Sequence, residues 1–117
     1  MKSKGSSLNL EGIKNIIMKA YFRDKYLKKR GLLELAAEIE EELSELDIDF
    51  QNFNLKEDRY IHILCNDADE RQKLIDFFVA KQSILVVQAN GKRYYGKYAK
   101  SDERDKFKQE MKDVDKR

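Results

Sequence analysis

Apolar residues recur every three or four positions from Ile13 onward, after a polar segment at 1–9 that is rich in Ser, Lys and Gly. This spacing predicts an amphipathic helix that ends near Lys29, just before Gly31. Its apolar positions are Ile13, Ile16, Ile17, Ala20 and Tyr21. We expect residues 1–9 to form a flexible arm. Residues 10–117 are expected to form a single α+β domain, because a chain of 117 residues is long enough for one core.

A second helix is predicted directly after Gly31. Its apolar stripe contains Leu32, Ala36, Ile39, Leu43 and Leu46. Acidic residues line the opposite side of this helix, at Glu34, Glu38, Glu41 and Glu45. The two helices are expected to pair as an N-terminal helical hairpin with Gly31 at the corner.

The period of the apolar positions then changes to two, which is typical of β-strands. One strand is expected over 48–55 and a second over 60–65. A helix follows from Asp67, and its buried positions are Leu74, Ile75, Phe78 and Val79. A last helix begins at Ser101 and carries a thin stripe of Phe107, Met111 and Val114.

The pair Asn90-Gly91 is the strongest local signal, because Asn-Gly between two strand-like runs marks a two-residue hairpin turn. The expected register sets Ala89 opposite Lys92, Gln88 opposite Arg93, Val87 opposite Tyr94 and Val86 opposite Tyr95. One face of the hairpin then carries a mixture of apolar, aromatic and cationic residues. They are Ile84, Val86, Gln88, Arg93, Tyr95 and Lys97.

These elements predict an α+β fold, in which the helical hairpin is followed by the order ββαββα and a four-stranded, mainly antiparallel sheet. From the second helix onward the order is similar to that of the LAGLIDADG homing endonucleases, which read DNA on a saddle-shaped sheet. The similarity is in element order only, and Glu45-Leu46-Asp47 lacks the small-residue pattern of the motif helix in that family. No residue and no nuclease activity is therefore transferred.

Candidate catalytic and metal-binding groups are few. His62 and Cys65 are the only imidazole and thiol, and their spacing of three on a strand sends the two side chains to opposite faces. No glycine-rich phosphate loop or paired-carboxylate motif is present. We therefore predict that the protein is not an enzyme and that it has no cofactor, metal site or catalytic residue.

The composition indicates a soluble, cytoplasmic protein without a membrane partner. Charged residues make up 39% of the chain, the longest apolar run is Ile84 to Val87, and a single cysteine cannot form an internal disulfide. The formal net charge is only +2, but its distribution is uneven. Residues 14–30 contain seven cations and one acid, whereas residues 34–49 contain eight acids and no base.

The cations and tyrosines favour a small nucleic-acid-binding accessory or regulatory protein as the leading function. Lysine and arginine can hold phosphates, and a tyrosine ring can stack on a base. The predicted phosphate-binding residues are Lys28, Lys29, Arg30, Lys92, Arg93, Lys97 and Lys100, and the predicted stacking residue is Tyr95. The wider cationic cluster of the first helix consists of Lys19, Arg23, Lys25, Lys28, Lys29 and Arg30.

The alternative function is a protein-interaction module, such as a small inhibitor or adaptor of the kind that mobile elements encode. It would act through the acidic helix face of Glu34, Glu38, Glu41 and Glu45, or through an exposed sheet face. That acidic face could instead neutralise the basic helix beside it, within one chain or across a homodimer. A homodimer is also expected if Ile84 and Val86 leave apolar surface on the hairpin.

Overall fold

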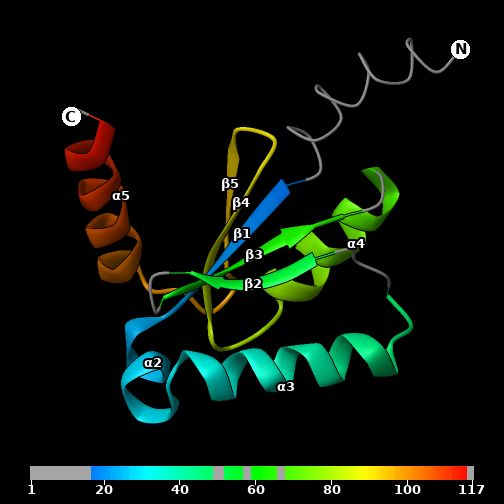
Figure 1. Ribbon diagram of the computed structural model, residues 1–117. Coiled ribbons are helices and arrows are strands. Elements are labelled where there is room, and N and C mark those ends of the chain that lie inside the picture. Colours follow the sequence, from blue (N-terminus) through cyan, green and yellow to red (C-terminus); the bar gives the residue numbers. More distant parts are fainter. Residues whose placement is uncertain (1–16, 49–51, 57–58, 66–67, 116–117) are drawn as a thin grey trace, which may run out of the picture.

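The computed structural model describes residues 17–48, 52–56, 59–65 and 68–115 (Figure 1). The predicted arm at 1–9 lies outside these residues. The described chain contains helices and an antiparallel sheet, which confirms the α+β class. In chain order the elements are β1 (Ile17–Phe22), α2 (Asp24–Arg30), α3 (Leu32–Glu45), β2 (Asn52–Lys56), β3 (Tyr60–Leu64), α4 (Ala68–Val79), β4 (Ile84–Ala89), β5 (Lys92–Tyr95) and α5 (Ser101–Asp115).

The first predicted helix is wrong over residues 17–22, which form the strand β1; positions 13–16 lie outside the described residues. The structural reason is burial on both faces. Met18, Ala20 and Phe22 are fully buried in one core, while Tyr21 is buried in a second. A strand that is apolar on both faces lacks strict alternation, so its pattern resembles that of a helix. Only α2 remains of the predicted helix, and it meets α3 at Gly31, whose φ of 88° is open to glycine.

The sheet has five strands in the order β2-β3-β1-β4-β5, and every pairing in it is antiparallel. The four strands that the sequence predicts are all present. The fifth, β1, lies between the β2–β3 and β4–β5 hairpins and joins them. The predicted register of the Asn90-Gly91 hairpin is confirmed over four pairs, from Ala89 opposite Lys92 to Val86 opposite Tyr95. The expected continuation of the pairing to Lys97 is wrong, because β5 ends at Tyr95 and the Lys97 amide donates to Val79 instead.

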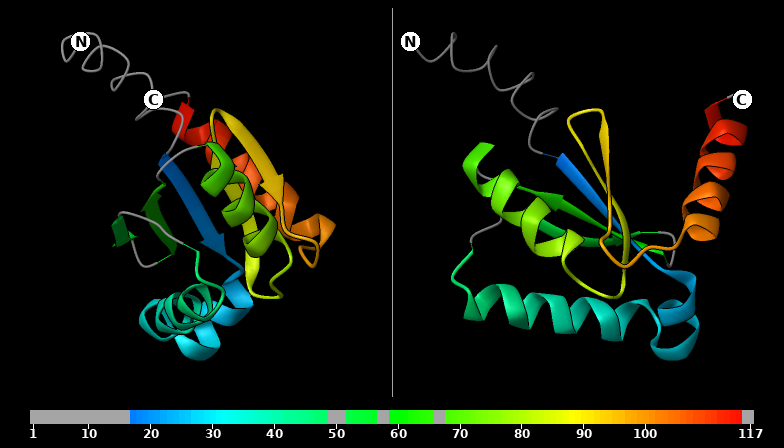
Figure 2. Two further views of the ribbon diagram at one scale, coloured as in Figure 1. Left: turned by 90° about the vertical axis from the view of Figure 1, so that its right-hand side faces the viewer. Right: turned by 180° about the vertical axis from the view of Figure 1, so that it is seen from behind.

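The two faces of the sheet are covered unequally. On one face, buried residues of α3 and α4 such as Leu35, Ile39 and Phe78 pack with Ile61 and Ile63 of β3. On the other face, α5 supplies Phe107, which is fully buried against Tyr21 and Val86. Figure 2 shows α5 standing across the sheet from α3. Within the described residues, no helix has both the length and the apolar character needed to cross a membrane.

Ion pairs fasten α5 to the body of the protein. The buried Arg23 donates from Nε to both carboxylate oxygens of Glu103, at 3.0 and 3.1 Å, and from Nη1 to the carbonyl oxygen of Gln82 at 2.8 Å. Further along the helix, Arg59 contacts Glu110 at 3.0 Å, and Lys106 contacts Asp24 at 3.1 Å. The helix is therefore held by the buried Phe107 ring and by ion pairs with residues that are distant in sequence.

Gly96 marks a close approach at the end of β5. Its amide donates to the carbonyl oxygen of Leu85 at 2.8 Å. A Cβ at this position would overlap the backbone carbonyl oxygen of Ile84. The glycine thus lets the chain leave β5 against the start of β4.

We expect Gly96→Ala to lower the free energy of unfolding by about 1–3 kcal/mol, because the added methyl group must push two backbone segments apart. Lys97→Ala is the control, since this neighbouring side chain is exposed and its loss should change stability by less than about 0.5 kcal/mol. Denaturant unfolding of both variants tests this. Equal stability of Gly96→Ala and the parent would show that the close approach is absent.

A second prediction concerns the anchoring of α5. Glu103→Gln should lower the free energy of unfolding by about 2 kcal/mol, because it removes the charge that faces the buried Arg23 guanidinium. Asp24→Asn, at the more exposed Lys106 pair, should leave the unfolding midpoint nearly unchanged. If the two substitutions lower the midpoint equally, the Arg23–Glu103 pair has no special role.

Candidate nucleic-acid interface

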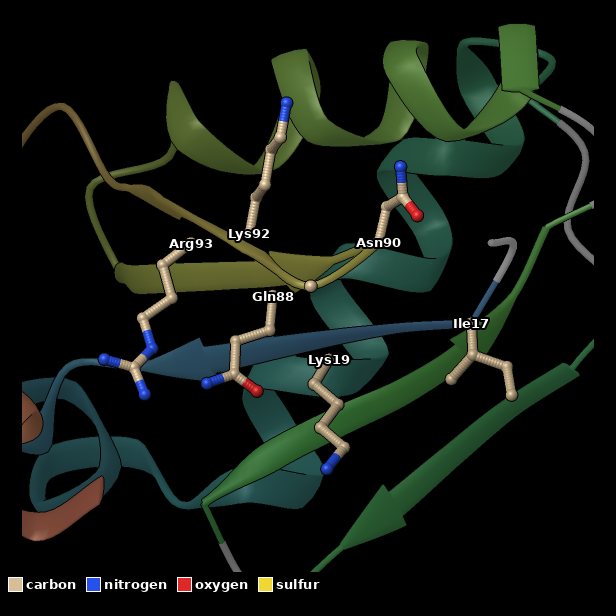
Figure 3. A pocket seen from close by; sticks show the side chains of 7 residues that line it. Ile17, Lys19, Gln88, Asn90, Lys92 and Arg93 are labelled. Carbon is tan, nitrogen blue, oxygen red and sulfur yellow. The ribbon is translucent and has the colours of Figure 1, made fainter. Parts of the chain in front are cut away.

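A row of polar residues crosses four strands of the sheet on the face that α5 partly covers. The register pairs Arg93 with Gln88, Gln88 with Lys19, and Lys19 with His62. Directly opposed residues in antiparallel strands project to the same face, so the four side chains form one continuous row. We call these residues the polar row. Figure 3 shows Lys19, Gln88 and Arg93 projecting to the same side from β1, β4 and β5.

The next row along the same strands is apolar and lies under α5. It consists of Tyr95, Val86, Tyr21 and Tyr60, which are paired in the same way. The ring of Tyr21 packs 4.6 Å from that of Tyr60 and 4.9 Å from that of Phe107, measured between centroids. The polar row therefore lies directly beside the row that α5 covers.

A hollow of about 360 Å³ opens at the polar row. Its lining consists of Ile17, Lys19, Gln88, Asn90, Gly91, Lys92 and Arg93. All three charged residues of the lining are cations. None of Lys19, Lys92 and Arg93 forms an ion pair with the described part of the chain. The hollow is therefore a site of positive potential to which the described residues supply no counter-charge.

Ring contacts orient two of these cations. The Lys19 Nζ lies 5.6 Å from the centroid of the Tyr60 ring, and the Arg93 Cζ lies 5.4 Å from that of Phe107. Such contacts attract a cation without neutralising it. Lys92 and Asn90 project from the end of the hairpin to the opposite side from Lys19, Gln88 and Arg93 (Figure 3). The hairpin end thus presents positive charge on both of its sides.

Tyr95, the residue predicted to stack on a base, is half-buried and packs on the core cluster beneath α5. Its hydroxyl is buried and has no hydrogen-bond partner among the described residues, and the Lys108 Nζ lies 5.6 Å from its ring centroid. The ring is therefore part of the contact between α5 and the sheet. The sequence indicates only a thin apolar stripe on α5, and it could not show that this stripe lands on Tyr95.

The other predicted cations lie elsewhere. Lys28, Lys29, Lys97 and Lys100 are exposed. Lys97 follows β5 and donates its amide to the carbonyl oxygen of Val79 at 2.7 Å. Its neighbour Tyr98 lines a second hollow of about 430 Å³ together with Arg30. The structure thus brings Lys92 and Arg93 together at the first hollow, and Arg30 and Tyr98 at the second.

The second hollow is electrically balanced. Arg30 donates from Nε to Glu34 at 2.6 Å and from Nη1 to Glu38 at 3.2 Å. The hydrogen bond that Arg30 donates to Glu34, together with the one to Glu38, raises the pKa of its guanidinium, which stays charged. Lys81, which lines the same hollow, contacts Glu42. Two of the four acids proposed for protein interaction, Glu34 and Glu38, therefore face a cation of their own chain.

Glu41 and Glu45, the other two predicted interaction acids, are exposed on α3. Sequence reasoning missed the contribution of Lys19, Gln88 and Ile17 to one hollow, and counted Lys19 among the cations of a helix. The available signal was Lys19 itself, the one charged residue in the otherwise mostly apolar run Ile17–Phe22. In a strand, this lysine would project from one face of the sheet.

A scan of protein-family models finds no match to this chain, and searches of curated proteins and of solved structures find none either. Within the described residues, no group of three or more His, Cys, Asp or Glu side chains could hold a metal ion. The interpretation of the site therefore rests on its own geometry and charge.

We expect Tyr95→Phe to raise the free energy of unfolding by about 1 kcal/mol, because it removes a buried hydroxyl that has no hydrogen-bond partner in the described part of the chain. Tyr94→Phe is the matched control on the opposite face of β5 and should change stability by less than about 0.5 kcal/mol. Thermal unfolding of the two variants gives the comparison. Destabilisation by Tyr95→Phe would mean that the hydroxyl is bonded.

Proposed function

We propose that this protein binds nucleic acid at the hollow beside the polar row. The observation that carries the proposal is that Lys19 and Arg93 project to the same side at one hollow, whose described lining also includes Lys92 and contains no acid. A polyanion supplies the counter-charge that the described chain lacks there. Phosphate contacts of this kind provide most of the affinity of non-specific nucleic-acid binding.

The remaining lining supports the same ligand. Gln88 and Asn90 carry amide groups, which can donate to and accept from sugar hydroxyls and base edges. Ile17 adds a half-buried apolar side chain at the other end of the hollow. Cations, amides and an apolar contact are thus available within one surface.

The second hollow supports this function less well. Its cations Arg30 and Lys81 already face Glu34, Glu38 and Glu42, so a phosphate would have to displace a carboxylate. The exposed Lys28, Lys29, Lys97 and Lys100 remain candidates for weaker, outlying phosphate contacts. Their expected effect on affinity is smaller than that of Lys19 or Arg93.

Protein interaction through the acidic face of α3 and homodimer formation remain predictions, as does a cytoplasmic location. The motive for a homodimer is weakened, because Ile84 and Val86 are fully buried within one chain. Among the described residues, the large exposed hydrophobic side chains are Leu33, Leu46 and Tyr98. These three side chains do not indicate which kind of protein partner the acidic face of α3 would bind.

The proposal predicts measurable binding of a mixed-sequence oligonucleotide at about 20 mM salt, where screening is weak. Affinity should fall with a log–log slope of about −2 to −3, as expected for three neutralised phosphates. Lys19→Gln and Arg93→Gln should each weaken binding and reduce the slope by about 0.7–0.9. Fluorescence anisotropy over a series of salt concentrations measures both quantities.

Lys73→Gln is the control, since this exposed lysine lies on α4 and pairs with Glu70 at 3.9 Å. It makes the same change in charge and should leave affinity and slope almost unchanged. Unfolding curves verify that Lys19→Gln, which lies in the central strand, is folded. Absence of binding at low salt, or an equal loss from Lys73→Gln, would refute the proposal.

A further inference from the structure

The polar row is bordered on one side by α5, and this border restricts the ligand. On one side of it lie Tyr95, Val86 and Tyr21, which α5 covers. On the other side lies Ile17, the first residue of β1. Across the four strands the row extends for about 14 Å, given a spacing of about 4.8 Å between strands. The free surface beside the row is therefore a strip that α5 bounds on one side.

The helix α5 bounds this strip closely. The Arg93 Cζ lies 5.4 Å from the centroid of Phe107, the buried ring of α5. Lys108, one residue further along the helix, lies with its Nζ 5.6 Å from the Tyr95 ring centroid. Because a helix with its side chains is about 10 Å across, α5 forms a wall beside the row. A rigid duplex that approached the row would meet this wall.

Gln88, in the middle of the polar row, can contact a base. Gln88 lies between Lys19 and Arg93 in the register and is half-buried. In the described part of the chain its amide is paired with no hydrogen-bonding group, so both its donor and its acceptor are available. In a duplex the Watson–Crick edges are already paired, whereas the bases of a single strand can present theirs to side chains.

From this geometry we infer that the ligand of the polar row is a single strand of nucleic acid. The inference rests on the proposed function and specifies it. Lys19 and Arg93 hold phosphates on either side of Gln88, and the Gln88 amide bonds to the edge of a base between them. Lys92 contacts the chain where it passes the end of the hairpin.

The test compares one labelled oligonucleotide as a single strand and as a blunt duplex with its complement, at the same low salt. We expect the single strand to bind at least about tenfold more tightly. Gln88→Ala should weaken single-strand binding about fivefold without changing the salt slope, because the amide neutralises no phosphate. Gln88→Glu should weaken it further by placing an anion between two cations. Gln72→Ala on α4 is the matched control and should have no effect.

The outcomes separate the inference from the proposed function. Equal or tighter binding of the duplex, with sensitivity to Lys19→Gln and Arg93→Gln, overturns the inference and leaves the proposed function in place. Single-strand preference that is unaffected by Gln88→Ala and Gln88→Glu also overturns it, because the polar row is then not the contact. Failure of both probes to bind refutes the proposed function itself.

Discussion

The pairing of β1 with two strands that are distant in sequence is the constraint on which the rest of the structure depends. Residues 17–22 lie between β3 and β4, so they join the β2–β3 and β4–β5 hairpins into one sheet. An isolated two-stranded hairpin is only marginally stable in water. Because β1 pairs with both hairpins and is buried on both faces, it gives each of them a third strand and an apolar core to pack against. Met18, Ala20 and Phe22 anchor the side that α3 and α4 cover, while Tyr21 anchors the side of α5. The same pairing sets the position of Lys19. This residue projects to the same face of the sheet as Tyr21 and lies between His62 of β3 and Gln88 of β4.

The unequal cover of the two faces follows from the composition of the helices. α3 contributes several fully buried side chains, including Leu35, Ile39 and Leu43, and can cover a broad apolar surface. α5 contributes the fully buried ring of Phe107 and the partly buried Met111, and it otherwise meets the body through ion pairs, notably those of Glu103 and Glu110. A helix with so little apolar surface can cover one row of the sheet and no more. The polar row beside it is then exposed to water, which is consistent with its lysine, glutamine and arginine side chains.

The sequence predicted those elements whose signals are local. The Asn90-Gly91 turn set the register of β4 and β5 correctly, and periodicity located α3, α4 and α5, because each signal lies within about fifteen residues. The failure at β1 has a physical cause: a short strand buried on both faces has no period that separates it from a helix. The site was predicted only in part, because only some of its residues are close in sequence. Lys92 and Arg93 belong to the hairpin, whereas Lys19 reaches it only through long-range pairing. The burial of Tyr95 depends on the contacts of α5 with Arg23 and Arg59, which no local pattern encodes.

The charge of the protein is informative only once its pairs are known. A net charge of +2 on a chain with 24 cations and 22 acids would suggest no preference for any partner. Folding pairs Arg23 and Arg30 with carboxylates, and this reduces the strong basic character that residues 14–30 show in the sequence. Lys19, Lys92 and Arg93 are left without such partners in the described chain, and the fold places them around one hollow. Because the potential in a hollow depends on the nearest charges more than on the total, a nearly neutral protein can still present a local site for a polyanion.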